Sequence, residues 1–384
     1  MKKDSGWFWH HLVSTAFAFS IVAIYALLAF NLKIFNPLVQ VIKEYSITDF
    51  YYQVIDTNEE RDTSHIVTIV DIGDLRDRRD IAYALSEVME QHPKVVGVDI
   101  LFDGQKPENP VGDSLIAAVA ASDTSMVFAL QYYDDSFDGK QFNQVKQSFF
   151  ADSIPNLKEG LVNMQLDKLD GMRKKISLAK TVKGELRPSM IKLLSDKYAE
   201  QEIMPLADKT ININWSAIDF RVIPYDSIAD YGEFLNDRVV LFGSIRDEND
   251  THYTPQGKMP GIKLLAYGVE SMVKQTTITI APWWVNAILS FIAVLLTRIL
   301  FETGDQYAKG RKNIFARISL KSALAMGILK FLWIAFLMYV GFIVFAKYNI
   351  SINIAMALAA IPFIGPAEDL YRVITNSFSK NKEV

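Results

Sequence analysis

Long runs of apolar residues occur at four places along the chain, and each run is close to the length that crosses a membrane. They cover residues 12–30, 275–297, 323–346 and 348–367. A helix needs about 20 apolar residues to cross the hydrocarbon core, where its backbone must satisfy its own hydrogen bonds. The first run lacks a clear cleavage site at its end, which favours an uncleaved anchor over a signal peptide. The pattern therefore predicts four transmembrane helices.

Few polar or helix-breaking residues interrupt these runs. Lys330 is the one charged residue of the third run. We expect its ammonium group to reach the headgroups from near the inner end of a tilted helix, with a functional role inside the membrane as the alternative. Pro362 and Pro366 lie late in the fourth run. The turn between the third and fourth runs is only about residues 347–350, so those two helices should form an antiparallel hairpin.

Basic residues concentrate between the second and third runs, in the segment 298–321. They are Arg298, Lys309, Arg311, Lys312, Arg317 and Lys321. Short loops rich in Lys and Arg stay in the cytoplasm, and Lys2 and Lys3 before the first run agree with this orientation. Both termini are then expected in the cytoplasm, with the segment 32–274 outside.

This orientation predicts a multi-pass protein of the inner (cytoplasmic) membrane. We expect a cytoplasmic N-terminus and anchor at 1–31, an extracytoplasmic domain at 32–274, three transmembrane helices at 275–371 with a basic cytoplasmic loop at about 298–321, and a cytoplasmic tail at 372–384. In a Gram-negative cell the large domain would be periplasmic. None of the cytoplasmic pieces is near the size of a domain that folds alone, so any action there is expected to need a separate partner.

In the outer segment, short apolar runs alternate with stretches of helical periodicity. Strands are predicted at 66–71, 95–100, 126–130, 161–165, 176–182, 210–215 and 239–243, and helices at 79–91, 113–121, 188–198 and 261–274. Strands this apolar are typical of a sheet that is buried on both faces. The alternation predicts an α/β domain with a mixed, largely parallel sheet flanked by helices. We expect the first three strands to lie side by side, and the strands 161–165 and 176–182 to pair around the turn Asp170-Gly171.

Composition narrows the class of protein. Half of the residues are hydrophobic while 22% are charged, a mixture that suggests a polar domain joined to membrane segments. The net charge of −4 does not indicate the excess of basic residues that is typical of nucleic-acid-binding proteins. The chain has no cysteine, which excludes disulfides, thiolate metal sites and cysteine nucleophiles.

Aspartates follow two of the predicted parallel strands. Asp71 ends the first strand, and Asp99 and Asp103 come at and after the end of the second. Ligands of open α/β sheets bind outside the carboxyl ends of the strands, so this edge is the predicted binding location. Asp74 and Arg78 are close in sequence and are included in the predicted site. The alternative is that these residues cap helices and form surface salt bridges.

A second acidic stretch, RDENDTH at 246–252, follows the last strand and could reach the same edge. Its candidate ligand-binding residues are Asp247, Asp250 and His252. Their spacing lacks the D-x-[DN]-x-[DN]-G pattern of a calcium loop, and a single histidine is no transition-metal set, so we predict no metal. The stretch is either part of a ligand site or a solvated loop.

Catalytic motifs are not found in the sequence. Ser244 follows Gly243 but lacks the G-x-S-x-G elbow, and no glycine-rich loop for phosphate occurs. We therefore predict that the protein is not an enzyme and has neither catalytic residues nor a cofactor.

Several short motifs, in a fixed order, resemble the CHASE sensory domain of the second type. They are IVDIGDLRDRRDIAYALSEVMEQHPKVVGVDILF at 69–102, LDGMRKKISLAK at 169–180 with Arg173 in the family's basic position, INWS at 213–216, and VVLFGSIRDENDTHYTPQGKMPGIKLLAYGVESMV at 239–273. The resemblance covers about residues 35–275 and continues into the three spans that follow. It implies a sensory domain and brings no catalytic residues. The family's domains often precede a fused effector, and we expect a separate effector here.

Three classes of function remain. The first is a membrane sensory or signal-transducing protein that detects an extracytoplasmic cue and acts through a separate partner. The second is a non-sensing envelope scaffold or membrane-complex subunit. The third, a transporter, is disfavoured because the apolar runs carry almost no ionisable residue besides Lys330. The expected partners are the lipid bilayer, a separate signalling effector or membrane protein, and a second copy of the chain, but not nucleic acid.

Overall fold

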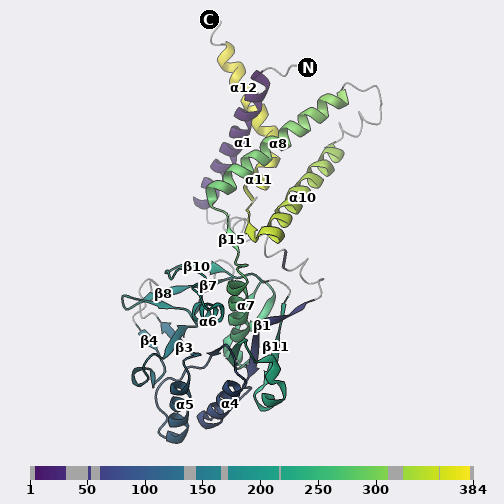
Figure 1. The fold of residues 1–384 in the computed structure, drawn as a ribbon. Coiled ribbons are helices and arrows are strands. Elements are labelled where there is room, and N and C mark those ends of the chain that lie inside the picture. The colour runs from purple at the N-terminus through teal and green to yellow at the C-terminus, as the bar shows by residue number, and fades with distance from the viewer. Residues whose placement is uncertain are drawn as a thin grey trace. The chain divides into compact units, whose positions relative to one another are not determined.

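The computed structural model describes residues 5–31, 51–52, 61–133, 144–165, 172–215, 218–309, 323–353 and 355–380. The chain divides into two compact units. One is Tyr52–Ile278, called the α/β unit below, and the other combines Met1–Tyr51 with Thr279–Val384 and is called the helical unit. Figure 1 labels many of the elements of both.

A seven-stranded sheet forms the centre of the α/β unit, in the order β11-β1-β12-β2-β3-β4 with β5 also paired to β3. The strands are β1 (Asp62–Asp71), β2 (Val95–Val98), β3 (Met126–Tyr133), β4 (Gln144–Lys146), β5 (Lys158–Leu161), β11 (Ile218–Pro224) and β12 (Val239–Gly243). Every pairing is parallel except that between β3 and β4. All residues of β2 and β12 are buried, as expected for strands covered on both faces.

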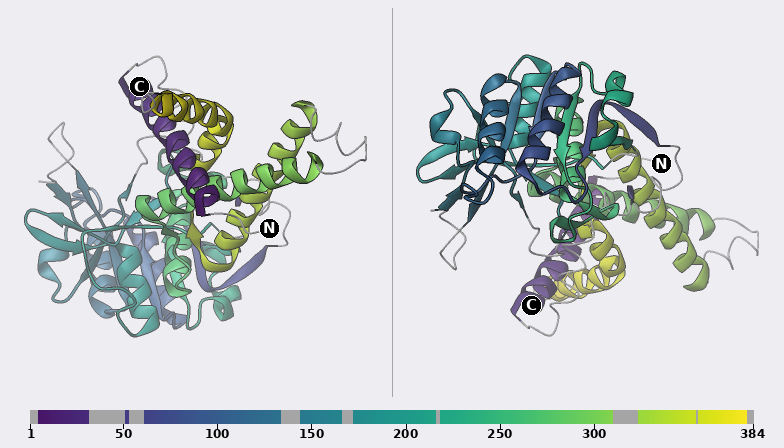
Figure 2. Two further views of the ribbon diagram at one scale, coloured as in Figure 1. Left: turned by 90° about the horizontal axis from the view of Figure 1, so that it is seen from above. Right: turned by 90° about the horizontal axis from the view of Figure 1, so that it is seen from below.

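Side-chain alternation assigns the helices to opposite faces of this sheet. Val96 and Val98 point into a core shared with α4 (Arg78–Glu90) and α5 (Pro110–Ser122). Between them, a Cβ on Gly97 would lie 2.7 Å from Leu194 of α6 (Met190–Ala199), so the other face carries α6. The helix α7 (Gly261–Val273) packs beside α6. The unit is therefore a three-layer α/β/α sandwich, which Figure 2 shows from two further directions.

Side-chain caps fix where three of these helices begin. The side chain of Asp77 accepts a hydrogen bond from the Arg79 N–H at 2.8 Å, at the start of α4. Asn109 and Ser189 cap α5 and α6 in the same way. Each cap satisfies a backbone N–H that has no partner within its helix.

The prediction of a largely parallel sheet flanked by helices is confirmed, but the strand order differs from the expected one. The strands predicted at 66–71 and 95–100 are not adjacent, because β12 lies between β1 and β2. β12 is the most distant of the three in sequence and is buried along its whole length, which suits the centre of the sheet. Periodicity shows that a strand is buried but does not give its neighbours.

Smaller sheets complete the α/β unit. β6 (Met164–Gln165) and β10 (Thr210–Asn212) flank β7 (Lys175–Ser177), both antiparallel to it, and β8 (Ala179–Val182) pairs with β9 (Glu185–Pro188). The expected pairing of 161–165 with 176–182 is thus found between β6 and β7, while Leu161 belongs to β5 of the main sheet. The predicted turn at Asp170-Gly171 lies outside the described residues.

The helical unit contains, in its described part, three helices that are long and apolar enough to cross a membrane. They are α1 (Ser5–Asn31), α8 (Trp283–Lys309) and α10 (Ala323–Tyr348), with candidate spans at Trp7–Ile24, Trp283–Thr303 and Phe331–Tyr348. Large apolar side chains such as Phe331 and Leu332 are exposed on α10. A helix with this surface is suited to a lipid environment.

The fourth apolar run does not form one continuous spanning helix in the described residues. Asn349 has a positive φ of 53° just after α10, and β16 (Ile350–Ser351) then pairs with β15 (Thr279–Ile280). Helical structure resumes in α11 (Ala355–Ala360), η7 (Ile361–Phe363) and α12 (Ile364–Lys380). Pro362 and Pro366 have no N–H to donate, so the helix is segmented where they lie. The prediction of four continuous apolar helices is corrected accordingly.

α8 differs from its predicted span at both ends. It begins at Trp283 rather than near 275, and it continues to Lys309. Residues 298–309, which we expected in a basic loop, are therefore helical, and Arg298 and Glu302 fall within the candidate span. The rest of the predicted loop, from 310 to 322, and the side chain of Lys330 lie outside what the structure describes.

Candidate functional site

A cavity of about 150 Å³ lies at the carboxyl end of the parallel strands in the α/β unit. Its lining residues are Asp99, Gln131, Val162, Asn163, Arg173, Asp250, His252, Gly261 and Leu265. They come from the ends of β2 and β3, the segments after β5 and before β7, the η6–β13 region, and the start of α7. Parts of the chain that are far apart in sequence thus meet at the edge where parallel α/β sheets bind ligands.

Asp99 directly follows β2, and the strand register sets its surroundings. Because Val98 pairs with Phe242 of β12, Asp99 lies next to Gly243. A Cβ added to Gly243 would lie 3.2 Å from the Asp99 Cβ. The glycine therefore leaves room for the aspartate side chain on the α7 face of the sheet.

The Asp99 carboxyl receives no hydrogen bond from the described residues, although its own backbone N–H donates to the Phe242 carbonyl at 2.9 Å. Burial, and to a smaller extent the negative charge of Asp250, raises the pKa of this carboxyl to about 7. Near neutral pH the group is therefore divided between its acid and its carboxylate form.

Asp250 and His252 form the wall that faces α7. Asp250 ends η6 (Glu248–Asp250), and its Oδ1 lies 2.9 Å from Nε2 of His252 on β13 (Thr251–Thr254). A Cβ on Gly261 would collide with the Asp250 carboxylate, which places that carboxylate at the first turn of α7. A negative charge is favourable at a helix N-terminus. Asp250 is therefore held between an imidazole and the start of a helix.

Arg173 supplies positive charge to the same cavity. Its backbone N–H donates to the Tyr253 carbonyl at 2.8 Å, which ties the segment before β7 to β13. Burial lowers the pKa of the guanidinium, and Asp250 acts in the opposite direction. Arg173 is the basic residue of the LDGMRKKISLAK motif, although its side chain was not among the residues that we predicted to bind a ligand.

Two amide side chains in the cavity have different roles. Asn163 is committed to the fold, because its amide accepts from the Tyr132 N–H at 2.9 Å and donates to the Tyr132 carbonyl at 3.0 Å. Gln131 lies on the same face of the sheet as Asp99, because Val98 pairs with Phe128 and alternate residues share a face. Within the described part of the chain, the Gln131 amide makes no hydrogen bond, so it can receive a ligand.

The structure brings three of the eight predicted site residues together at the cavity: Asp99, Asp250 and His252. The others are Asp71, Asp74, Arg78, Asp103 and Asp247, and none of them lines it. Asp74, Asp103 and Asp247 are exposed. Asp103 pairs with Lys146 at 3.1 Å, and Asp247 accepts from the Asn249 N–H at the start of η6.

Asp71 and Arg78 have contacts that favour the structural alternative. The Asp71 carboxyl, 4% exposed, accepts from the N–H groups of Gly73 and Ile245 at 2.9 and 3.1 Å, and so fastens two loops. Arg78 forms a buried ion pair with Asp113 of α5 and donates to a carbonyl at 2.9 Å. This pair lies in the layer of α4 and α5, on the sheet face opposite the cavity.

A wider hollow of about 550 Å³ lies near the amino ends of the strands. Its charged rim includes Lys94 and Glu200, which pair with each other at 2.9 Å. These groups satisfy one another at the surface, and the hollow therefore offers less for a ligand than the cavity at Asp99.

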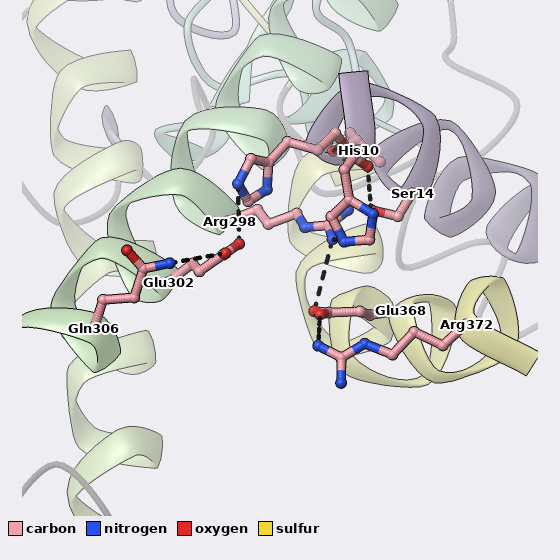
Figure 3. Close-up of polar contacts among 9 residues, drawn as sticks. His10, Ser14, Arg298, Glu302, Gln306, Glu368 and Arg372 are labelled. Atoms are coloured by element: carbon pink, nitrogen blue, oxygen red, sulfur yellow. Dashed lines mark hydrogen bonds and ion pairs between the residues drawn. The ribbon is translucent and has the colours of Figure 1, made fainter. Parts of the chain in front are cut away.

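A second polar site lies in the helical unit, around Arg298 of α8 (Figure 3). Arg298 is 3% exposed, and its guanidinium donates to the His11 carbonyl of α1 at 3.3 Å. It also lies 3.2 Å from Nε2 of His10 and 3.7 Å from Oε2 of Glu368 on α12. Glu302, one turn further along α8, lies 2.9 Å from the His11 imidazole. One buried cation thus connects three helices.

Sequence reasoning missed this cluster because the second apolar run stops at residue 297. Charged residues inside a membrane span are rare and often functional, and a pairing between α8 and α12 has no local sequence signal. The sequence signal that could have revealed the cluster is the presence of acidic residues near the end of a span. Glu302 and Glu368 can neutralise the positive charge of Arg298, which follows the second apolar run.

The three long apolar helices indicate a membrane protein. The same chain carries an α/β sandwich with a polar cavity. The chain belongs to the CHASE2 domain family, whose model matches residues 16–300. CHASE2 is a family of sensory domains, and the match confirms the resemblance seen in the sequence. Comparison with curated proteins and with solved structures finds no match.

Proposed function

We propose that this protein is a membrane-bound sensor that binds a small polar molecule in the Asp99 cavity and acts through a separate partner. The observation that supports this most directly is the cavity at the carboxyl edge of the sheet, where Asp99 has no hydrogen-bond donor among the described residues. Membership of a sensory domain family supports the sensing role.

The cavity suits a small ligand. A volume of about 150 Å³ is enough for several water molecules or one small polar molecule. A few convergent polar groups in a concave site are typical of specific small-molecule binding. The lining residues supply carboxylate, imidazole, guanidinium and amide groups, which can hold a small polar ligand by charge and hydrogen bonds.

We assign the α/β unit to the outside of the inner membrane and both termini to the cytoplasm. The three apolar helices support membrane crossing, and the segmented helix α11–η7–α12 is assigned as the fourth crossing. The basic residues of the segment 298–321 mark the cytoplasmic side. Reporter fusions at Gly139 and Gly310 test this topology, and a fusion at Gly310 that reports from outside contradicts it.

The proposed signal path runs along the chain from the cavity to the second span. Gly261 lines the cavity and begins α7, and only residues 274–282 separate the end of α7 from the start of α8. A ligand that favours one position of α7 would favour one arrangement of α8. Equal affinity for both arrangements would shift nothing.

The Arg298 cluster is the proposed response element of the helical unit. Moving α8 away from α1 or α12 would leave buried charges uncompensated, so few helix arrangements are favourable. We propose that the partner recognises one of these arrangements, with the basic residues of 309–321 and the tail 372–384 as docking surfaces.

The alternative is a non-sensing envelope scaffold or membrane-complex subunit, for which no ligand is needed. A transporter is disfavoured less strongly than the sequence suggested, because Arg298, Glu302 and Glu368 place charge within the helical unit.

Hydrogen–deuterium exchange of the full-length protein in lipid nanodiscs separates sensor from scaffold. A library of small polar molecules is screened for slower exchange in the segments 95–102 and 259–266. For a compound that binds, Asp99→Asn should remove the effect, whereas Asp103→Asn, an exposed control, should keep it. If no compound changes exchange at the cavity, the scaffold alternative is favoured.

A further inference from the structure

We propose that the ligand of the Asp99 cavity is a small protonated amine, held by the Asp99 carboxylate and the amide oxygen of Gln131. This inference rests on the proposed function and specifies the class of ligand. It follows from the charges that face the cavity and from the hydrogen bonds that they already make.

Among the described residues that line the cavity, one carboxylate has no charge that opposes it. Arg173 is opposed by Asp250, whose charge acts on the guanidinium, and Asp250 is also hydrogen-bonded to His252. No cation of the described residues forms an ion pair with Asp99. When Asp99 is ionised, the carboxylates of Asp99 and Asp250 outweigh the single guanidinium of Arg173 by one negative charge. A monovalent cation restores neutrality.

Hydrogen-bonding capacity points to the same class of cation. Asp99 and Gln131 share a sheet face, and their oxygens accept no hydrogen bond from the part of the chain that is described. An ammonium group has three N–H donors and no acceptor, so it matches a carboxylate beside an amide oxygen. A buried carboxylate without donors is costly, and a bound amine removes that cost.

Other ligand classes fit less well. A divalent metal would need several protein ligands, and no group of three or more His, Cys, Asp or Glu side chains that could hold one occurs among the described residues. An anion would face both Asp99 and Asp250. The cavity volume of about 150 Å³ favours a small amine over a large one.

A proton competes with the amine for Asp99. Burial raises the pKa of this carboxyl to about 7, so the carboxylate fraction falls from about 0.9 at pH 8 to about 0.1 at pH 6. Amine affinity should therefore fall about tenfold over this interval. The other charged or titratable groups that line the cavity are Arg173, Asp250 and His252, while α7 contributes only Gly261 and Leu265.

The test uses the full-length protein in nanodiscs made of a zwitterionic lipid. Methylamine and ethanolamine are titrated as probes, and exchange is followed in the segments 95–102 and 259–266. Tetramethylammonium carries the same charge without an N–H group, and acetate carries the opposite charge, so both serve as controls. The amines should slow exchange and the controls should not.

Variants and pH then assign the effect to Asp99. Asp99→Asn should weaken amine binding at least tenfold, and Gln131→Leu should weaken it less. His252→Gln removes the imidazole from the cavity, so a tenfold pH effect that persists in this variant belongs to Asp99. Thermal unfolding of each variant confirms that it is folded.

The outcomes separate this inference from the proposed function. Amine binding that is lost in Asp99→Asn and weaker at pH 6 supports both the amine inference and the proposed sensor function. Binding of another compound in the cavity, with no response to the amines, overturns the amine inference and leaves the sensor. Exchange that no compound alters overturns both.

Discussion

The side chain of Asp99 lies against the bare Cα of Gly243, where the carboxyl ends of β2 and β12 meet. A Cβ at this glycine would be 3.2 Å from the Asp99 Cβ and 3.0 Å from Cδ1 of Ile262 on α7. Both distances are short for carbon atoms, so the space at residue 243 accommodates the hydrogen atom of glycine but not a methyl group without movement of its neighbours. The position of Asp99 in the cavity therefore depends on the absence of a side chain at residue 243.

Gly243→Ala should destabilise the α/β unit and displace Asp99. Overpacking of a close contact typically costs about 1–3 kcal/mol, because neighbouring atoms must move. We expect a lower midpoint of denaturant unfolding and, in the same variant, weaker amine binding. Equal unfolding midpoints for the variant and the parent protein would show that the strand and helix are less closely packed than the structure indicates.

Asp99→Asn should change how stability depends on pH. The folded-state pKa of about 7 lies above the unfolded value of about 3.9, so the protonated carboxyl stabilises the fold fully below pH 4 and this contribution is lost as pH rises to 7. The variant cannot ionise and should be more stable than the parent at pH 8, by on the order of 2–4 kcal/mol. Denaturant titrations at pH 4.5, 6 and 8 measure the difference, which should shrink toward low pH. Asp103→Asn is the exposed control and should follow the parent at each pH.

The ion pair between Arg78 and Asp113 should affect stability rather than ligand binding. The two side chains are 5% and 10% exposed, so Arg78→Met leaves a buried carboxylate uncompensated, at a cost of about 3–5 kcal/mol. Arg78→Met combined with Asp113→Leu should recover most of this loss, because both charges are then absent. Unfolding midpoints test the prediction. A ligand role for Arg78 would be indicated if the single variant kept its stability and lost amine binding.

Much of the architecture could be predicted because its signals are local. The apolar strands β2 and β12 and the periodic helices α4 and α7 are found close to their predicted positions. The strand order could not be predicted, since β12 enters between β1 and β2 from more than 130 residues away in sequence. Neighbours in a parallel sheet are set by crossover packing, which leaves no mark on any single strand.

The candidate site shows the same limit. An aspartate at the end of a strand and an acidic loop after another strand were sufficient to predict that Asp99, Asp250 and His252 meet at one edge of the sheet. The same reasoning included Asp71 and Arg78, whose sequence context is similar but whose partners, Ile245 and Asp113, are distant along the chain. Whether a carboxylate binds a ligand or a loop depends on donors that only the folded chain brings near.

Partner capture is expected to depend on the basic segment. Replacing Arg311, Lys312 and Arg317 with alanine should weaken capture of a specific partner from native membranes by crosslinking, because three positive charges leave the proposed docking surface. Membrane insertion should remain largely intact, since Lys309 and Lys321 still mark the cytoplasmic side. Equal recovery of every partner by the triple variant and the parent would remove this segment from the docking surface.

Arg298 should hold α12 against α1. The chain has no cysteine, so pairs of cysteines can be introduced without removing others. Phe17 of α1 and Tyr371 of α12 have ring centroids 5.9 Å apart, so the thiols of Phe17→Cys and Tyr371→Cys should be joined readily by a short bifunctional thiol reagent in nanodiscs. Adding Arg298→Leu removes the contacts of the guanidinium with α1 and leaves Glu368 without this partner, so the crosslink yield should fall several-fold. The matched comparison is Phe19→Cys with Phe291→Cys, which joins α1 to α8 through an apolar contact at 5.6 Å. These two helices keep the contact of Glu302 with His11 in the Arg298→Leu background, so this pair should lose less yield than the first. If both pairs keep their yields, apolar packing alone positions α12, and the cluster is not the response element.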